Sequence, residues 1–279
     1  MKQLSINEIK QVSLDILSHF HEFCVKNNLH YSMWAGSLIG TIRHHGYIPW
    51  DDDIDLCMPR PDYDLFFKLY KDSDEYAVFN YDKNGALLSW GRICDMKRTC
   101  SFTNYKWTNK NTGVYISIFP IDGAEPDLES LQRRFDICCE WCKENYSLRN
   151  LFRALSRYGS VNENIFIILR KIKYLSRLYS LKNKMLDNVR KHNEECRKYD
   201  FNTSDYVIDL AFASRKYRPK ALWPKEDFDE FILAEFEERS VMIIKGYDRS
   251  LRLRYGDYMQ LPPVEQQVAM HGSTNFYWK

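Results

Sequence analysis

The segment DDDID at positions 51–55 constrains this chain more than any other, because it sets four carboxylates directly before an apolar stretch. Apolar residues at positions 54, 56 and 58 alternate with polar or small ones, which is the period of a β-strand. Side chains of a strand alternate between its faces, so we expect Asp51, Asp53 and Asp55 on one side and Asp52 on the other. Carboxylates about 6.6 Å apart repel one another unless a cation lies between them or one takes up a proton. The segment therefore predicts a cation site on a strand.

Oxygen ligands of this kind favour a hard divalent cation. Mg²⁺, or Mn²⁺ in its place, accepts carboxylate oxygens and completes its coordination with water and substrate phosphates. A solvated acidic turn is the alternative for an isolated DDD. An EF-hand calcium loop is excluded, because Leu56 stands at its required glycine and Pro59 and Pro61 interrupt it. We expect Mg²⁺ here, with Asp53 and Asp55 as its ligands.

A second feature, Gly36-Ser37, precedes apolar residues at helical spacing and predicts a helix that begins there. The N-terminus of a helix offers unpaired N–H groups and a positive dipole end to an anion such as phosphate. Such pairs are common at helix starts, so this one decides nothing alone. Followed by a strand with Asp53-x-Asp55, it matches the layout of a nucleotidyltransferase site, with phosphate on the helix and metal on the strand.

The rest of the chain predicts an α/β (α+β) protein in which a small mixed sheet is flanked by helices. A capping box at Ser5 and Glu8 opens an amphipathic helix over residues 5 to about 28. Strands are expected at 29–34, 54–58, 76–81, 87–94 and 114–119, the last closed by a turn at 120–123. The pattern from 127 to 199 is strongly helical. We therefore expect a nucleotidyltransferase-like catalytic core at 1–126 and a mainly helical region at 127–279 whose end returns to the active site.

Composition and charge narrow the class of protein. Lysine and arginine total 40 against 38 acidic residues, and this net charge of +2 gives no reason to expect nucleic acid as a partner. The N-terminal segment lacks the apolar core of a secretory signal, and the run from Ile165 to Leu169 is too short to cross a bilayer. The eight cysteines do not show the spacing of a secreted disulfide scaffold. We expect a cytoplasmic protein with reduced thiols.

Residues 36–66, GSLIGTIRHHGYIPWDDDIDLCMPRPDYDLF, closely resemble the signature of the LicD family of phosphotransferases, a branch of the nucleotidyltransferase superfamily. Further stretches resemble family landmarks in the family's order: GVYISIFPIDG at 113–123, WPK at 223–225, YGDYM at 255–259 and LPP at 261–263. The resemblance spans residues 31 to about 271, which is nearly the whole chain.

The resemblance implies a reaction. Members of the family move phosphocholine from CDP-choline onto bacterial surface glycans such as lipopolysaccharide, teichoic acid or capsule, and relatives transfer polyol phosphates such as glycerol or ribitol phosphate. This chain would then be an Mg²⁺-dependent transferase with a nucleotide-activated donor and a glycan acceptor, which is often linked to a lipid carrier. Two alternatives stay open: a nucleotidyltransferase that builds the activated donor and, more distantly, a nucleic-acid-binding protein.

The resemblance also implies metal ligands. Asp53 and Asp55 would bind one or two Mg²⁺ ions, and Asp51 would act as a further ligand or as a base. The family commonly has a third carboxylate on the strand that reads IDIFP, where this chain has Ser117. Asp122, just beyond, is the substitute that we expect to complete the catalytic and metal-binding set.

Substrate contacts are expected from residues around the first motif and from the C-terminal end. The expected substrate-binding residues are Gly36, Ser37, Arg43, Trp50, Arg92 and His271. The two arginines would pair with phosphate oxygens, although a structural ion pair is an equally ordinary role for each. Four aromatic residues could surround the choline cation or serve in the core: Trp34, Tyr47, Trp50 and Trp90.

Two other features, a basic segment and a group of cysteines with a histidine, could each have a role of their own. Residues 149–198 carry 13 basic and four acidic residues, with an apolar stripe at Ile168, Ile172, Leu175 and Tyr179. This helix would lie on an anionic membrane surface or present an ordinary solvated face, and we favour the latter.

The cysteines and histidine at 139, 142, 192 and 196 are types that suit Zn²⁺, but buried helical cysteines more often serve as small apolar residues.

Overall fold

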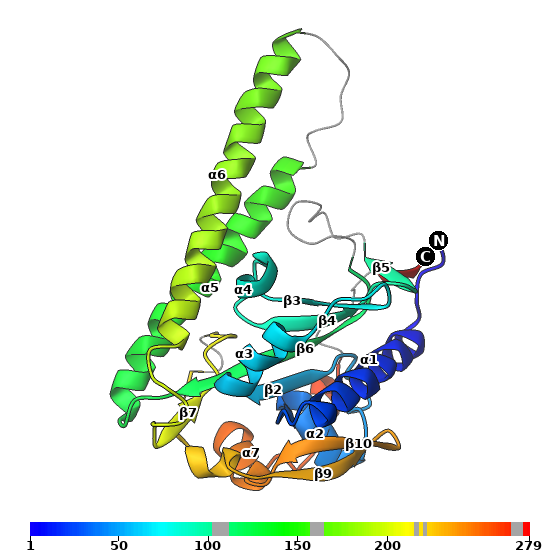
Figure 1. Cartoon of the computed structure of the whole chain (residues 1–279), viewed down its shortest axis with the longest axis vertical. Coiled ribbons are helices and arrows are strands. Elements are labelled where there is room, and N and C mark those ends of the chain that lie inside the picture. Colours follow the sequence, from blue (N-terminus) through cyan, green and yellow to red (C-terminus); the bar gives the residue numbers. More distant parts are fainter. Residues whose placement is uncertain (102–111, 157–164, 215–217, 220–221, 269–275) are drawn as a thin grey trace.

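A computed structural model describes residues 1–101, 112–156, 165–214, 218–219, 222–268 and 276–279, and their side chains except those of 149–175 and 178. Figure 1 shows a curved sheet with helices on both faces. Two long helices, α5 (Leu128–Ser156) and α6 (Ile165–Cys196), form a pair that extends away from it. The mixed α/β class predicted from the sequence is confirmed.

The main sheet is mixed. Five strands follow the order β1-β2-β6-β4-β3, where β1 is Ser32–Met33, β2 Asp55–Pro59, β6 Tyr115–Gly123, β4 Gly91–Asp95 and β3 Tyr76–Phe79. Strands β2 and β6 run parallel, and the other neighbours are antiparallel. Two later strands, β7 (Tyr206–Ile208) and β8 (Trp223–Pro224), extend the sheet from the far end of β6. Residues after the long helix pair therefore contribute to the same sheet as the first part of the chain.

Short elements surround this sheet. The helices are α1 (Ile6–Lys26), α2 (Ala35–His44), α3 (Arg60–Leu69), α4 (Tyr81–Asn84) and α7 (Tyr247–Tyr255), with 3₁₀ turns η2 (Lys225–Phe228) and η3 (Val264–Gln266). Strands β9 (Phe231–Phe236) and β10 (Arg239–Ile244) form a hairpin, and β5 (Thr99–Ser101) pairs with β11 (Phe276–Trp278). The capping box predicted at Ser5 and Glu8 is present at the start of α1.

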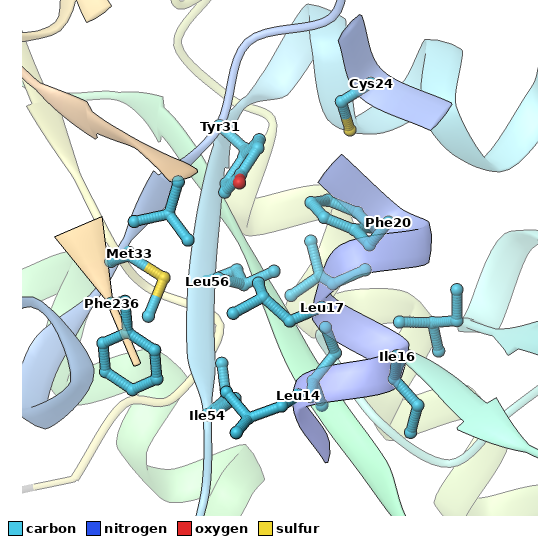
Figure 2. Packing of buried hydrophobic residues seen from close by; sticks show 14 of the residues in the cluster. Leu14, Ile16, Leu17, Phe20, Cys24, Tyr31, Met33, Ile54, Leu56 and Phe236 are labelled. Carbon is cyan, nitrogen blue, oxygen red and sulfur yellow. The ribbon is translucent and has the colours of Figure 1, made fainter. Parts of the chain in front are cut away.

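The alternation of side chains along β2 and β6 separates two cores. Leu56 and Ile118 join the cluster beneath α1 and α3, whereas Cys57, Phe119 and Ile121 face the cluster beneath α5. Figure 2 shows Leu14, Leu17 and Phe20 of α1 directed at Ile54 and Leu56. Truncating a fully buried side chain such as Phe20 to alanine would cost about 3–5 kcal/mol.

The expected turn at 120–123 is wrong, because β6 continues through Pro120 to Gly123. Pairing with β4 ends at Ile118, so Pro120 lies where that side of the strand no longer needs an N–H donor. Pairing with β2 continues to Ile121. The domain boundary near residue 126 stays a prediction.

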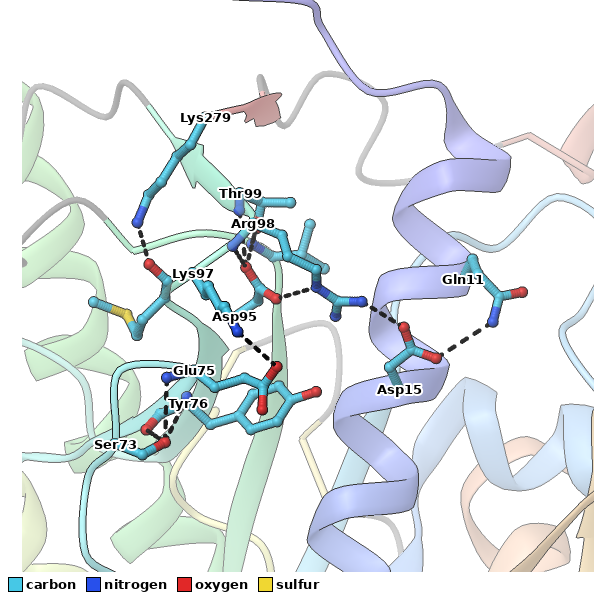
Figure 3. Close-up of polar contacts among 12 residues, drawn as sticks. Gln11, Asp15, Ser73, Glu75, Tyr76, Asp95, Lys97, Arg98, Thr99 and Lys279 are labelled. Atoms are coloured by element: carbon cyan, nitrogen blue, oxygen red, sulfur yellow. Dashed lines mark hydrogen bonds and ion pairs between the residues drawn. The ribbon is translucent and has the colours of Figure 1, made fainter.

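The turn between β4 and β5 is fastened to α1 by charged groups. Asp95 accepts bonds from Arg98 Nε at 2.7 Å and Thr99 Oγ1 at 3.0 Å, and Arg98 Nη1 reaches Asp15 Oδ2 at 2.7 Å (Figure 3). The two ends of the chain lie side by side here, where Trp278 N donates to Lys2 O at 2.9 Å. These contacts are structural and lie away from the acidic segment.

Candidate active site

The acidic segment precedes β2 and is not part of it. The strand begins at Asp55, so the alternation expected for residues 51–54 does not occur. Carboxylate oxygens of Asp51, Asp52 and Asp53 gather within 4.8 Å of one another. The expectation that Asp52 points away is therefore wrong. An extended strand would have separated these groups, and the irregular backbone brings them together.

Asp55 lies at the first position of β2, next to this cluster. Burial, and then the negative charges of Asp53, Asp51 and Asp209, raise the pKa of the Asp55 carboxyl well above its usual range. The ionised form of the Asp55 carboxyl is therefore destabilised by its neighbours, and a nearby cation would stabilise it. The repulsion predicted from the sequence is present in the structure.

Asp209 is a site residue that the sequence analysis missed. It follows β7 directly, and its Oδ2 accepts a hydrogen bond from Trp34 Nε1 at 3.1 Å and lies 4.0 Å from Arg254 Nη1. Burial raises the pKa of Asp209, while Arg254 and Trp34 oppose that rise. Its one local signal was an acidic residue at the end of an apolar strand, and only the pairing of β7 with β6 brings it near Asp55.

The residues present fit a hard divalent cation. Oδ1 of Asp52 and Oδ1 of Asp209 are both buried and have no hydrogen-bond partner among the described residues. A buried carboxylate oxygen left unpaired is costly, and an oxygen-binding cation would satisfy it. The carboxylates of Asp53 and Asp55 add the oxygen ligands that Mg²⁺ prefers.

Helix α2 begins beside the same cluster. Its N-cap residue, Trp34, gives the first turn no side-chain cap, and the positive end of the helix dipole favours an anion there. Gly36 allows close approach, since a Cβ there would lie 2.8 Å from Asp51 Oδ2. Ser37 Oγ accepts the backbone N–H of Asp55 at 3.0 Å, which couples helix and strand. Ala35 has a φ of +49°, an uncommon conformation for a residue with a side chain.

Arg92 completes a row of side chains across three strands. In the sheet register Arg92 lies opposite Ser117, and Ser117 lies opposite Asp55, so all three share one face. The Arg92 guanidinium lies 3.8 Å from the centre of the Tyr115 ring, and its buried Nε has no hydrogen-bond partner among the described residues. A positioned cation with an unused donor beside carboxylates is suited to bind a phosphate that a metal also holds.

The structure places Asp122 outside this site, which corrects its assignment as a metal ligand. Asp122 lies five residues beyond Ser117, about 16 Å along β6, and on the opposite face of the sheet. Both of its oxygens accept bonds from Arg60, Nε to Oδ1 at 2.6 Å and Nη2 to Oδ2 at 2.8 Å. The carboxylate is therefore already paired.

Arg43 also has a different role from the one expected. Its Nη1 donates to the carbonyls of Tyr258 at 2.6 Å and Gln260 at 3.2 Å, so it fastens the chain that follows α7. Trp50 is half-buried against the main core, and His271 lies outside the described residues. Among the expected substrate-binding residues, the structure brings Gly36 to Asp51 and Ser37 to Asp55, and it sets Arg92 in the same row of the sheet as Asp55, two strands away.

The aromatic residues proposed to surround choline do not form one cage. Trp34 is buried against Trp223, and Tyr47 is buried against Phe236, so both belong to the core. Trp90 stacks on Phe119 with ring centres 5.6 Å apart. Packing in the core therefore explains at least Trp34 and Tyr47, which is the second of the two roles considered for these aromatic residues.

The basic segment is only partly described. The side chains of its apolar stripe before residue 176 lie outside the described set, and Tyr179 is exposed. Arg190 pairs with Asp187 and Glu194, as on a solvated helix face. None of the described helices combines the length and the apolar character that crossing a bilayer requires.

Clustered carboxylates, the N-terminus of a helix and a positioned arginine together suit an enzyme that handles phosphate esters. Comparison with known proteins agrees. Residues 28–142 match the family model described as LicD/FKTN/FKRP, nucleotidyltransferase domain. The lipopolysaccharide cholinephosphotransferase LicD of Haemophilus influenzae is 32% identical over 282 residues, which cover 97% of each chain. An uncharacterized protein of Rickettsia prowazekii is 28% identical over 120 residues, or 42% of each chain.

This chain therefore belongs to the LicD family, and it is an enzyme of the phosphotransferase class. The resemblance carried by residues 36–66 is confirmed. The family model covers strands β1 to β6 and the acidic segment. The match to the Haemophilus protein extends through the segments that supply Asp209 and Arg254.

Proposed function

We propose that this protein transfers phosphocholine from CDP-choline to a hydroxyl group of a bacterial surface glycan, and that the reaction depends on Mg²⁺. One observation carries the proposal: a protein named as a lipopolysaccharide cholinephosphotransferase matches this chain over 97% of both lengths. The acidic cluster and Arg92 supply the charges that such a reaction needs. Lipopolysaccharide is accordingly the acceptor class that we favour.

The chemistry assigns a task to each group. The acceptor oxygen forms a bond to the phosphorus that carries choline, the bond from that phosphorus to the bridging oxygen breaks, and CMP leaves. Bound Mg²⁺ would be held by Asp53, Asp55 and Asp209 and would offset the negative charge of the diphosphate. Arg92 binds a phosphate oxygen through its unpaired Nε.

The hydroxyl proton needs an acceptor, and we assign this role to Asp51. Its Oδ2 lies close to Gly36 in the first turn of α2, where the positive end of the helix dipole favours the ionised carboxylate. The backbone N–H groups in this first turn of α2 can also contact the donor diphosphate. Asp51 thus lies between the phosphate site and the metal site.

A donor panel tests the function. Purified protein with Mg²⁺ and lipopolysaccharide acceptor would be supplied with CDP-choline, CDP-ethanolamine, CDP-glycerol or CDP-ribitol, and CMP release measured. We expect acceptor-dependent release that is fastest with CDP-choline. Release of pyrophosphate from CTP and phosphocholine, with no CMP from any donor, would instead identify a donor-forming nucleotidyltransferase.

Site variants make the test specific. Asp53→Asn and Asp55→Asn should each abolish CMP release, because each removes a carboxylate charge from the metal site. Asp74→Asn, an exposed carboxylate outside the cluster, is the matched control and should keep the wild-type rate. Near-normal rates in either site variant would refute the assignment.

A further inference from the structure

A second cluster of metal-binding side chains lies between α5 and α6, near the base of this helix pair. Donor atoms of Cys138, His192 and Cys196 lie within 4.8 Å of one another, and all three residues are buried. Cys142 Sγ lies 3.6 Å from His192 Nδ1. Two thiols and one imidazole therefore meet at one point, and a third thiol lies next to the imidazole, on a part of the molecule that the proposed reaction does not use.

Helical spacing explains this convergence. Cys138 and Cys142 are four residues apart on α5, and His192 and Cys196 are four residues apart on α6, so each pair lies on one helix face. The two helices present these faces to each other. The sequence analysis combined Cys139 with the other three, whereas the structure gives that place to Cys138.

The orientation of His192 is fixed as a metal ligand requires. Its Nε2 lies 2.8 Å from the carbonyl oxygen of Leu210, which can only accept, so Nε2 carries a hydrogen. Nδ1 therefore faces the thiols and Ser89 Oγ, which is 2.7 Å away. A histidine that binds a metal through one nitrogen commonly donates the other N–H to a backbone carbonyl in this way.

The chemistry of the donor atoms indicates which metal the cluster would select. Soft thiolate and imidazole ligands select Zn²⁺ over the hard cations that suit the acidic cluster.

We propose that Cys138, Cys142, His192 and Cys196 bind one Zn²⁺ ion in a closed structural site. In a tetrahedral Cys₃His site the sulfur atoms lie about 3.8 Å apart, so Cys138, His192 and Cys196, already within 4.8 Å of one another, need only a small contraction, while Cys142 has to turn toward them from its contact with His192. The Ser89 hydroxyl is then free to donate to a bound thiolate. Binding releases the protons that the ligands carry.

The position of the site indicates what the ion would do. It joins α5 to α6 across their facing surfaces, and the bond from His192 to Leu210 extends the connection to the segment that carries Asp209. The ion would therefore hold the helix pair at a fixed angle to the sheet. This inference does not depend on which donor or acceptor the enzyme uses.

Metal content provides the test. The full chain, produced with zinc in the medium and purified without a polyhistidine tag or chelator, would be measured by inductively coupled plasma mass spectrometry. We expect close to one zinc ion per chain. Cys138→Ser and Cys196→Ser should each lower the zinc content by roughly tenfold or more. Cobalt substitution of the wild type should give the visible absorption of a tetrahedral thiolate site.

Matched variants separate this site from other sources of zinc. Cys139→Ser changes a buried cysteine next to Cys138 and should keep its zinc, and Asp53→Asn should also keep it. Circular dichroism would show that each variant is folded. Wild-type protein without stoichiometric zinc, equal zinc in the Cys138 and Cys139 variants, or a Cys138–Cys196 disulfide in the purified chain would overturn the proposal.

Discussion

Arg60 and Asp122 form a buried, two-point ion pair at the end of β6, with Nε–Oδ1 and Nη2–Oδ2 distances of 2.6 and 2.8 Å. The arginine is largely buried, and the pair joins the start of α3 to the sheet. Because of this location, Asp122 stabilises the fold. The candidate catalytic residues lie at the opposite end of β2, where Asp55 begins the strand.

Asp122→Asn should therefore destabilise the protein without weakening its Mg²⁺ site. Removing the two-point carboxylate partner of the buried Arg60 should cost about 3–5 kcal/mol in the free energy of unfolding. Asp64→Asn is the control, because Asp64 contacts the same guanidinium at 3.6 Å from an exposed position and should cost about 0–1 kcal/mol. Urea denaturation and Mg²⁺ titration calorimetry measure the two quantities. A large loss of Mg²⁺ affinity in folded Asp122→Asn protein would contradict this assignment.

Asp55→Asn should abolish activity and yet stabilise the protein when no Mg²⁺ is present. The pKa of Asp55 is raised in the folded state, so the folded state holds a proton that the unfolded chain releases above about pH 4. Wild-type stability should fall as the pH rises from about 4 through that raised pKa, and the variant lacks this loss. At pH 8 we expect the variant to have the higher Tm, by about 2–4 °C for each kcal/mol by which its free energy of unfolding exceeds that of the wild type. Near pH 4 the Tm values of the two proteins should converge.

Arg92→Gln should lower kcat/KM by roughly 10- to 100-fold, since a charged hydrogen bond to phosphate is worth about 1.5–3 kcal/mol. The Tm should change little, because the buried Nε of Arg92 has no hydrogen-bond partner among the described residues. Arg197→Gln, which removes an exposed arginine paired with Asp64 and Asp82, is the control for loss of positive charge. Equal kinetics in the two variants would remove Arg92 from the donor site.

Asp209→Asn should weaken Mg²⁺ binding by about tenfold, as expected for a lost metal contact. Asparagine can still accept the Trp34 hydrogen bond, so the local structure should survive. The exposed neighbour Asp205 provides the control, Asp205→Asn, with unchanged affinity. Titration calorimetry without nucleotide keeps the measurement independent of turnover. An unchanged affinity in Asp209→Asn would leave the metal to Asp51, Asp53 and Asp55.

Much of the fold is legible in the sequence because it depends on neighbours along the chain. The capping box at Ser5 and Glu8 and the apolar spacing behind it predict α1 within a few residues, since both act within one helical turn. The strand after the acidic segment is also predicted, although its first residue is Asp55 and not Asp51. The repulsion among the carboxylates of residues 51–55 is predicted correctly for the same reason, because these residues are adjacent in the chain.

The errors in the roles assigned to Asp122 and Arg43 concern residues whose neighbours lie far away in the sequence. Asp122 and Ser117 belong to one strand, yet pairing with β2 sets Ser117 beside Asp55 and turns Asp122 to the other face. Arg43 meets carbonyls more than 200 positions later. No local pattern signals either contact.

By itself, the sequence determined the class of this protein, its LicD-type motif and the acidic segment that repels itself, because local spacing controls helices, strands and charge density. The tertiary structure alone decided which distant groups share that charge. Strand β7 brings Asp209 to Asp55, the sheet register places Arg92 in the same row, and two facing helices gather Cys138 and His192. The physical reason is that electrostatic and metal-ligand interactions act over a few ångströms in space, whereas the order of residues fixes proximity only within a turn or a strand.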